Sequence, residues 1–261
     1  MAVESEKAEG AAAPEGAPER SQLRRLGNKR IRRRLLNRFG RIFGTYVLSS
    51  LTRRIVAINL VGLVALGTAH PDQLLLNANA QSGDVLILGK PLGIGIYSAA
   101  LKREILTPAH YEEMIASTTR LNTPGTDISA MEGVHAATDV TGFGLLGHLG
   151  AMARESAVTA RVESARVPAI DERVLGLIEE GCVPGGTRAN LAAAASTFQG
   201  DGVSETMRIL LADAQTSGGL LLAVPPGNLE DVLRILGDEG APCAEVIGEM
   251  VEQGDCAIEV R

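Results

Sequence analysis

The stretch 135–149, HAATDVTGFGLLGHL, constrains the fold more than any other part of the chain. A β-favouring approach leads through Asp139 into a glycine-spaced turn at 141–144, and an apolar helix is predicted to begin near Leu145. Glycines in such a turn let a ligand approach the backbone, and the first N–H groups of the helix favour anions. A carboxylate at the start of this turn would repel phosphate directly. We therefore predict that Asp139 binds a Mg²⁺ ion, which bridges to phosphate oxygens. The alternative is an ordinary strand-to-helix turn with Asp139 as the N-cap.

Short apolar strands alternate with helical patterns from His70 onward. Predicted strands cover 84–88, 134–139, 158–163, 219–224, 243–249 and 255–260. Predicted helices cover 96–103, 108–120, 145–154, 171–180, 205–211 and 228–236, with Asn228 as a cap; 122–125 is predicted as a turn, and 191–195 is of uncertain type. Thr107 and Pro108 form a start signal for the second helix. This alternation predicts an α/β fold with a mixed sheet covered by helices.

Five sequence runs carry a resemblance to one family. They are NANAQSGD at 77–84, KPLGIG at 90–95, TDVTGFGLLGH at 138–148, VPGGTRAN at 183–190 and DAQTSGGL at 213–220. Through them, residues 67–261 resemble the C-terminal part of selenophosphate synthetase (selenide, water dikinase). The resemblance implies the aminoimidazole-ribonucleotide-synthetase-like C-terminal α/β domain. Aminoimidazole ribonucleotide synthetase itself is disfavoured, because TDVTGFGLLGH and QTSGG match the selenium family more closely.

The resemblance also implies a chemistry. The family makes selenophosphate from selenide, ATP and water and releases AMP and phosphate, with Mg²⁺ as cofactor, and it forms homodimers in the cytoplasm. In the family's C-terminal domain the aspartate of TDVTGFG binds metal, which here is Asp139.

We expect a further set of residues to contact ATP: Lys90, Gly93, Gly95, Thr141 and Gly142. For Lys90 the alternative is a strand-ending lysine beside a tight turn. The family usually has Thr where this chain has Gly89, so part of that loop's polar capacity is missing.

Two later runs have both a binding and a structural interpretation. Thr187 and Arg188, after two glycines, could form an anion-binding nest, although a structural role is slightly favoured. Asn190 could instead bind a backbone group. Asp213 keeps the acid of the family's DPQTSGG run, where this chain has Ala in place of Pro.

His135 and His148 flank the central motif and have no Cys or second His at a metal-ligand spacing, so we interpret both as structural. The three cysteines, Cys182, Cys243 and Cys256, contain no CxxC pair, and their odd number argues against a disulfide framework and favours a reducing compartment. None is a good candidate for the family's selenide-handling residue.

The N-terminal part differs sharply in charge from the rest. Residues 1–54 hold 13 basic and 5 acidic residues, whereas the remainder holds 12 and 26. Residues 1–23 are predicted to be a disordered tail, because they have almost no large apolar side chains. Residues 24–66 are predicted to form a basic amphipathic and apolar arm, which either binds an anionic membrane surface or is a solvated tail; nucleic acid is not expected as a partner.

The apolar run 55–66 has about a dozen residues, whereas a membrane span needs about 20. Residues 49–64 weakly resemble the first membrane segment of some sensor histidine kinases. Together with the change in charge, this favours a chimera joined near Gly67; the alternative is that the run is a buried element of the domain.

Some residue types that the family needs for dikinase activity are absent from residues 1–66. Residues 1–66 contain no Asp, and no Cys precedes Cys182. In the family the N-terminal domain supplies a reactive Cys or selenocysteine, a Lys and several aspartates that hold metal and ATP. The resemblance therefore predicts little or no dikinase activity from this chain alone. The alternatives are a non-catalytic binding module tethered at a membrane surface, or a fusion or truncation product.

Overall fold

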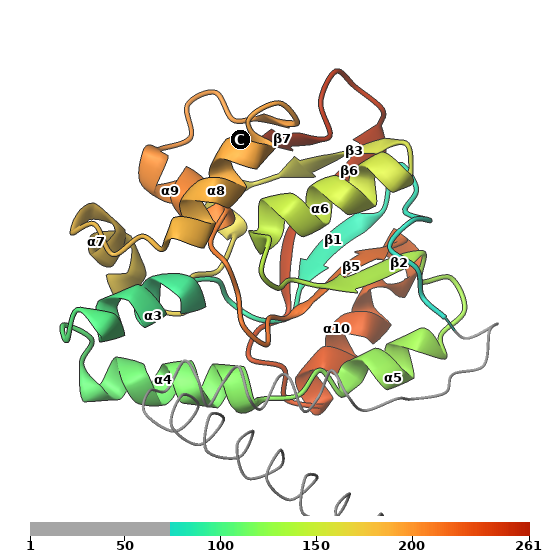
Figure 1. Cartoon of the computed structure of the whole chain (residues 1–261). Coiled ribbons are helices and arrows are strands. Elements are labelled where there is room, and N and C mark those ends of the chain that lie inside the picture. The colour runs from blue at the N-terminus through green and yellow to red at the C-terminus, as the bar shows by residue number, and fades with distance from the viewer. Residues whose placement is uncertain (1–73) are drawn as a thin grey trace, which may run out of the picture. The chain divides into compact units, whose positions relative to one another are not determined.

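A seven-stranded mixed sheet runs through residues 74–261, the part of the chain that the computed structural model describes (Figure 1). The strands are β1 (Val85–Leu88), β2 (Ala136–Asp139), β3 (Val158–Val162), β4 (Phe198–Gln199), β5 (Leu220–Val224), β6 (Glu245–Glu252) and β7 (Ile258–Val260). The helices are α3 (Ile94–Lys102), α4 (Pro108–Thr119), α5 (Pro124–Ser129), α6 (Gly144–Glu155), α7 (Arg173–Glu179), α8 (Gly185–Ala194), α9 (Glu205–Leu211) and α10 (Leu229–Asp238). Short 3-10 turns lie at Ser164–Arg166 and Pro226–Asn228. The predicted α/β fold with a helix-covered mixed sheet is confirmed.

The strand order is β2-β5-β1-β6-β3-β7-β4, which places β2 at one edge and β4 at the other. β7 pairs in parallel with β3 and β4, and the remaining pairs are antiparallel. A register shift between Leu86 and Ile87 interrupts the β1–β6 ladder. On the outer side of β2, the Ala137 N–H donates to the Leu76 carbonyl at 3.0 Å, so the segment before β1 covers part of that edge.

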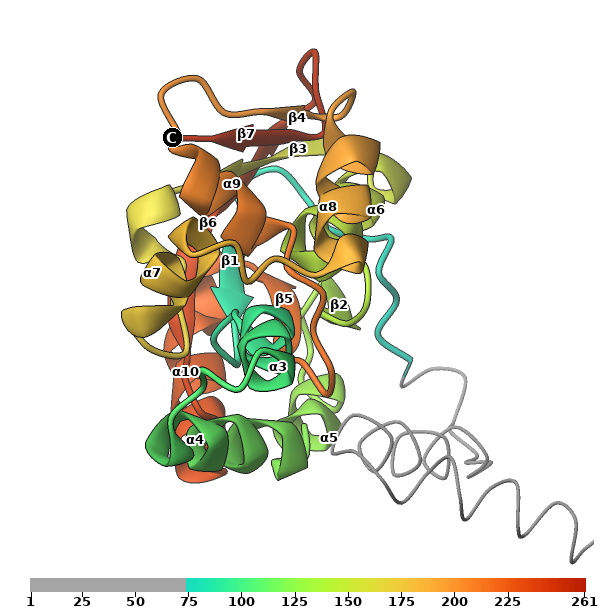
Figure 2. The ribbon, with the colours of Figure 1, turned by 60° about the vertical axis from the view of Figure 1, so that its left-hand side comes forward.

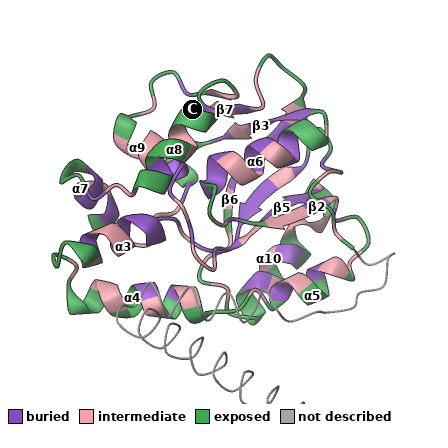
Figure 3. Ribbon diagram, viewed as in Figure 1, coloured by how far each residue is buried: buried purple, intermediate pink, exposed green. Residues whose placement is uncertain are grey.

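Helices cover both faces of the sheet. In Figure 1, α6 lies in front of the strands and α10 lies behind them. Ile87 and Leu222, which face each other across β1 and β5, pack with Val232 and Leu236 of α10 in one core cluster. Leu86, Ile87 and Leu88 are all buried, as expected for a central strand covered on both sides (Figure 3).

Several predicted elements match the structure closely. Thr107 is the N-cap of α4, and its side chain accepts a hydrogen bond from the His110 N–H at 3.3 Å, with Pro108 opening the helix. The helix predicted to stop at Gly181 is α7, and Gly181 has φ +81°, the left-handed conformation that glycine supplies after a helix.

Other elements differ from the predictions. The predicted turn at 122–125 is present, because the Gly125 N–H donates to the Asn122 carbonyl at 3.1 Å, but it continues into α5, which was not predicted. The stretch 191–195, whose type the sequence left uncertain, is mostly the end of α8. Asn228 occupies the N-cap position of α10, but its side chain does not cap the helix and instead donates to the Glu132 carbonyl at 2.9 Å. The N-cap position of α6 is Phe143, so the interpretation of Asp139 as an N-cap is also wrong.

The predictions for residues 1–66 lie outside the described residues. The chain divides into two units, Met1–Leu63 and Val64–Arg261, and all described residues belong to the second. Within 74–261, every helix is too short or too polar to cross a bilayer.

Candidate functional site

Asp139 is the last residue of edge strand β2, and its side chain is exposed. It lies opposite Leu220 of β5, and the next residue, Val140, donates its N–H to the Gly219 carbonyl at 2.9 Å. Within residues 74–261, no ion pair to Lys or Arg holds its carboxylate. The carboxylate is therefore available to one more ligand at this edge of the sheet.

The turn that follows Asp139 combines one open glycine with one constrained glycine. A Cβ at Gly142 would meet nothing within 4 Å, so the backbone there is open to a ligand. Gly144 has φ +69°, and a Cβ there would lie 2.6 Å from the Ala212 backbone. Phe143 lies between them and is 69% exposed. The turn is thus anchored at Gly144 and accessible at Gly142.

Thr141 and Asn190 hold this turn in place. The Thr141 carbonyl accepts from the Gly144 N–H and the Gln215 N–H, each at 3.0 Å. The Asn190 amide of α8 donates to the Gly142 carbonyl at 2.9 Å and to the Ala212 carbonyl at 3.1 Å. Asn190 thus binds backbone groups, as one interpretation of the sequence expected.

Lys90 is buried, and backbone carbonyls surround its ammonium group. Its Nζ donates to the carbonyls of Arg120 at 2.6 Å, Ser217 at 2.7 Å and Ser117 at 3.3 Å. Burial and then the neighbouring Arg120 lower the pKa of Lys90 to about 8, and Asp139 opposes this shift. These contacts support the structural alternative for Lys90.

Gly93 and Gly95 face the protein interior. Gly93 has φ +124°, and a Cβ there would lie 2.9 Å from the Val174 side chain. The Gly95 N–H donates to Asp213 Oδ2 at 2.9 Å, and a Cβ at Gly95 would lie 2.4 Å from the other carboxylate oxygen. The first N–H groups of α3 therefore bind a buried carboxylate of the protein itself, rather than being open to an external phosphate.

Asp213 is the centre of this network and is fully buried. Its Oδ1 accepts from the Thr187 hydroxyl at 2.8 Å, and its Oδ2 accepts from the Gln215 amide at 3.0 Å and the Ile96 N–H at 3.3 Å. Burial raises the pKa of Asp213 to about 6, and the hydrogen bonds oppose that rise. This role was not predicted from the sequence; the signal was an acid directly after the apolar run LLA and two residues before Gln215.

Thr187 and Arg188 point to different environments, which agrees with the structural role that was slightly favoured over an anion-binding nest. The Thr187 hydroxyl is buried against Asp213, whereas Arg188 is exposed. The two histidines bind within the protein: His135 Nδ1 lies 2.8 Å from the Asp84 carboxylate, and His148 Nε2 lies 3.1 Å from the Thr141 hydroxyl. Both contacts agree with structural roles.

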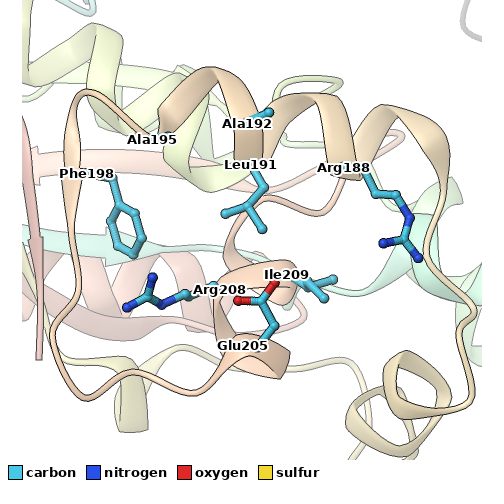
Figure 4. Close-up of a pocket in the computed structure, with 8 residues that line it drawn as sticks. All are labelled: Arg188, Leu191, Ala192, Ala195, Phe198, Glu205, Arg208 and Ile209. Carbon is cyan, nitrogen blue, oxygen red and sulfur yellow. The ribbon is translucent and has the colours of Figure 1, made fainter.

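A separate pocket of about 450 Å³ lies between α8 and α9 (Figure 4). Its lining includes Arg188 but none of the residues predicted to bind metal or ATP. Arg208 lies over the Phe198 ring at 5.7 Å and donates to the Gly200 and Val203 carbonyls. Because these contacts hold the loop between β4 and α9, Arg208 has a structural role in this pocket.

Comparisons with known proteins agree with this fold. Residues 81–261 match the family described as AIR synthase related protein, C-terminal domain. Over 192 residues the chain is 49% identical to selenide, water dikinase of Burkholderia pseudomallei (strain K96243), covering 73% of this chain and 54% of that protein. Over 200 residues it is 49% identical to selenide, water dikinase of Paraburkholderia xenovorans (strain LB400), covering 76% and 56%. The chain spans about half the length of these curated relatives.

Solved structures share the fold at low identity. HypE of E. coli, a hydrogenase maturation protein, has a TM-score of 0.52 and 19% identity, covering 71% of this chain and 48% of that one. A hydrogenase maturation protein HypE in complex with ATP has a TM-score of 0.51 and 20% identity, covering 74% and 52%. None of these relatives supports the resemblance of residues 49–64 to sensor histidine kinases.

Proposed function

Because this chain belongs to the AIR synthase related family through its C-terminal domain and is homologous there to selenide, water dikinases, we propose that it is the C-terminal half of such an enzyme. The reaction converts ATP, selenide and water to selenophosphate, AMP and phosphate. In this proposal Asp139 supplies one ligand to a Mg²⁺ ion bound with ATP. The ion would neutralise crowded phosphate oxygens.

The exposed carboxylate of Asp139 carries this proposal. It lies at the end of an edge strand, next to a turn whose Gly142 leaves the backbone accessible. A hard cation prefers such an oxygen ligand, and an open glycine backbone suits the approach of phosphate. The Lys90 ammonium would support the site from the protein interior, where it binds carbonyls of the two segments at 117–120 and 217.

One carboxylate is a poor Mg²⁺ site by itself, because Mg²⁺ needs six oxygen ligands in octahedral geometry. Among residues 74–261, Asp139 is in no group of three candidate metal ligands. We therefore propose that the remaining ligands for Mg²⁺, and those for selenide, come from the half of the enzyme that residues 74–261 do not contain. Dikinase activity of this chain alone should be very low.

The compartment, the oligomeric state and the roles of single residues are proposed by analogy with the selenide, water dikinase family. We propose the cytoplasm as compartment and the pairing of two copies. Lys90, Gly93 and Gly95 would shape the site from the inside, and Thr141 and Gly142 would face ATP.

A chimera tests the proposal. Residues 81–261 of this chain replace the matching segment of the Burkholderia pseudomallei enzyme, and selenide-dependent AMP release is measured with Mg²⁺ and ATP. We expect the chimera to be active and the unmodified chain to release little AMP. The substitution Asp139→Asn should lower the activity of the chimera at least about 100-fold, because a metal ligand is lost.

The matched control is Asp127→Asn, since Asp127 is an exposed aspartate on α5. This variant should keep the activity of the chimera. A folded but inactive chimera, or an Asp139→Asn chimera as active as its parent, would refute the proposal. Robust AMP release by the unmodified chain would refute the requirement for a second half.

A further inference from the structure

Three potential metal ligands converge on the side of the domain where α3 packs against both α4 and α7 (Figures 1 and 2). His110 and Glu113 come from the first turns of α4, and Asp171 comes from the loop before α7. One ligand atom from each lies within 4.8 Å of the other two. This cluster contains none of the residues of the proposed dikinase site.

The spacing of these atoms suits a shared ion better than direct hydrogen bonds. His110 Nε2 lies 3.7 Å from Asp171 Oδ1, which is too far for a hydrogen bond. Two ligands bound to one ion at about 2.0–2.1 Å lie about 3.4 Å apart in tetrahedral geometry. A small movement of these partly exposed side chains would bring all three to that spacing.

Neighbouring groups already orient two of the ligands. The Thr107 hydroxyl lies 3.0 Å from His110 Nδ1 and leaves Nε2 facing the carboxylates. The Tyr97 ring is fully buried and lies 5.6 Å from the His110 ring, and its hydroxyl donates to Glu113 Oε2 at 3.4 Å. Such outer contacts are typical supports of metal-binding histidines and carboxylates.

The local charge also favours a cation. Within residues 74–261, neither Glu113 nor Asp171 forms an ion pair with Lys or Arg. Among the described residues, His110 is the only basic side chain that pairs with either carboxylate, so their negative charge favours a cation.

We propose that His110, Glu113 and Asp171 bind a divalent transition-metal ion of the Zn²⁺ type. One imidazole nitrogen and two carboxylate oxygens suit Zn²⁺ better than Mg²⁺, which prefers oxygen ligands alone. Three protein ligands leave one position for water.

The bound ion would join the start of α4 to the loop before α7. That loop is itself attached to the segment just before α3, because the Ile170 N–H donates to the Leu92 carbonyl at 2.8 Å and Leu92 N–H donates to the Pro168 carbonyl at 2.9 Å. The ion would therefore connect α4, through the loop before α7, to the 90–95 loop, which contains Leu92.

Cobalt titration of the full chain tests the site. The chain is freed of metal with a chelator, and Co²⁺ is added at about pH 8, above the usual pKa of imidazole, while visible absorption is recorded. We expect one Co²⁺ per chain with nitrogen and oxygen ligands, displaced by Zn²⁺, and a higher melting temperature with Zn²⁺ bound. His110→Ala, Glu113→Gln and Asp171→Asn should each weaken binding at least about tenfold.

Two variants serve as controls. Glu112→Gln removes an exposed carboxylate one residue along α4, and Asp139→Asn removes the proposed Mg²⁺ ligand; neither should change Co²⁺ binding. Circular dichroism checks that each variant is folded. If His110→Ala does not fold, Glu113→Gln and Asp171→Asn still test the site, because they keep the size of the side chain. Absence of Co²⁺ binding, a sulfur-to-cobalt charge-transfer band, or equal affinity in the folded ligand variants would overturn the proposal. None of these outcomes bears on the dikinase assay.

Discussion

At the scale of single residues, Lys90 is a charged side chain with an internal role. Its ammonium group is surrounded by carbonyls from two segments, at 117–120 and at 217, that lie far from it in sequence. A buried charge is stabilising only when its hydrogen-bonding capacity is met, and removing the charge leaves the carbonyls unpaired.

We expect Lys90→Met to lower the free energy of unfolding by about 2–4 kcal/mol, because three carbonyls lose their donor. Urea denaturation of the variant and the parent chain measures this difference. The matched control is Lys102→Met at the exposed end of α3, where the change should be within about 0.5 kcal/mol. Equal stability of the Lys90→Met chain and its parent would contradict the structural role.

Asp213 makes stability depend on pH. Its pKa of about 6 in the folded chain lies above its ordinary value of 3.8, so the folded state binds more protons than the unfolded state between these values. The contribution of Asp213 is therefore fully present below about pH 4 and is lost as the pH rises through about 6.

We expect Asp213→Asn to remove this dependence. Between about pH 4 and 6, the parent chain should lose roughly 2–3 kcal/mol of stability relative to the variant, because only the parent ionises a buried carboxyl there. Urea denaturation of both chains at several pH values measures this difference in stability. The other carboxyl groups titrate in both chains, so their contributions cancel when the two free energies of unfolding are subtracted. Parallel pH profiles would show that Asp213 has an ordinary pKa.

At the scale of elements, α8 illustrates how tertiary contacts form a helix that local sequence leaves uncertain. It begins with Gly185 and Gly186, which are poor helix formers. Thr187 binds Asp213, and Asn190 binds the turn at Gly142. These contacts attach the helix to two loops that lie far apart in the sequence, one at Gly142 and one at Asp213.

Gly95 and Gly142 form a matched pair of test positions, because a Cβ would clash with the protein interior at Gly95 but would meet no neighbouring atom at Gly142. Gly95→Ala should destabilise the chain by about 1–3 kcal/mol, because the new Cβ would lie 2.4 Å from Asp213 Oδ1 at the start of α3. Gly142→Ala should change stability by no more than about 0.5 kcal/mol, because a Cβ there meets nothing within 4 Å. Thermal or urea denaturation compares the two, and equal effects would contradict this assignment.

At the scale of the whole molecule, the sheet, its covering helices and the described core cluster all belong to the unit Val64–Arg261. We expect the fragment 64–261 to fold by itself, with the same urea midpoint and slope as the full chain, because the slope follows the surface exposed on unfolding. Circular dichroism during urea denaturation provides the measurement. An aggregated fragment, or one with a clearly lower midpoint, would show that residues 1–63 contribute to the fold.

The sequence by itself determined the α/β class and most strands and helices, although β4, α5 and α8 were not predicted. These predictions rest on local signals: hydrophobic periodicity, the Thr107–Pro108 start of α4 and the glycine after α7. The family followed from the resemblance of five motif runs. The position of Asp139 at the mouth of a turn followed from the same signals, since strand, turn and helix are neighbours along the chain.

Only the tertiary structure decided which polar groups face inward. Lys90 is paired with a carbonyl 127 residues away, and Asp213 binds the start of α3 across 118 residues. The pairing of edge strand β2 with β5, which leaves Asp139 exposed, and the convergence of His110 with Asp171 also join distant segments. Local sequence encodes backbone preference, whereas burial and hydrogen-bond partners are set when remote segments pack together.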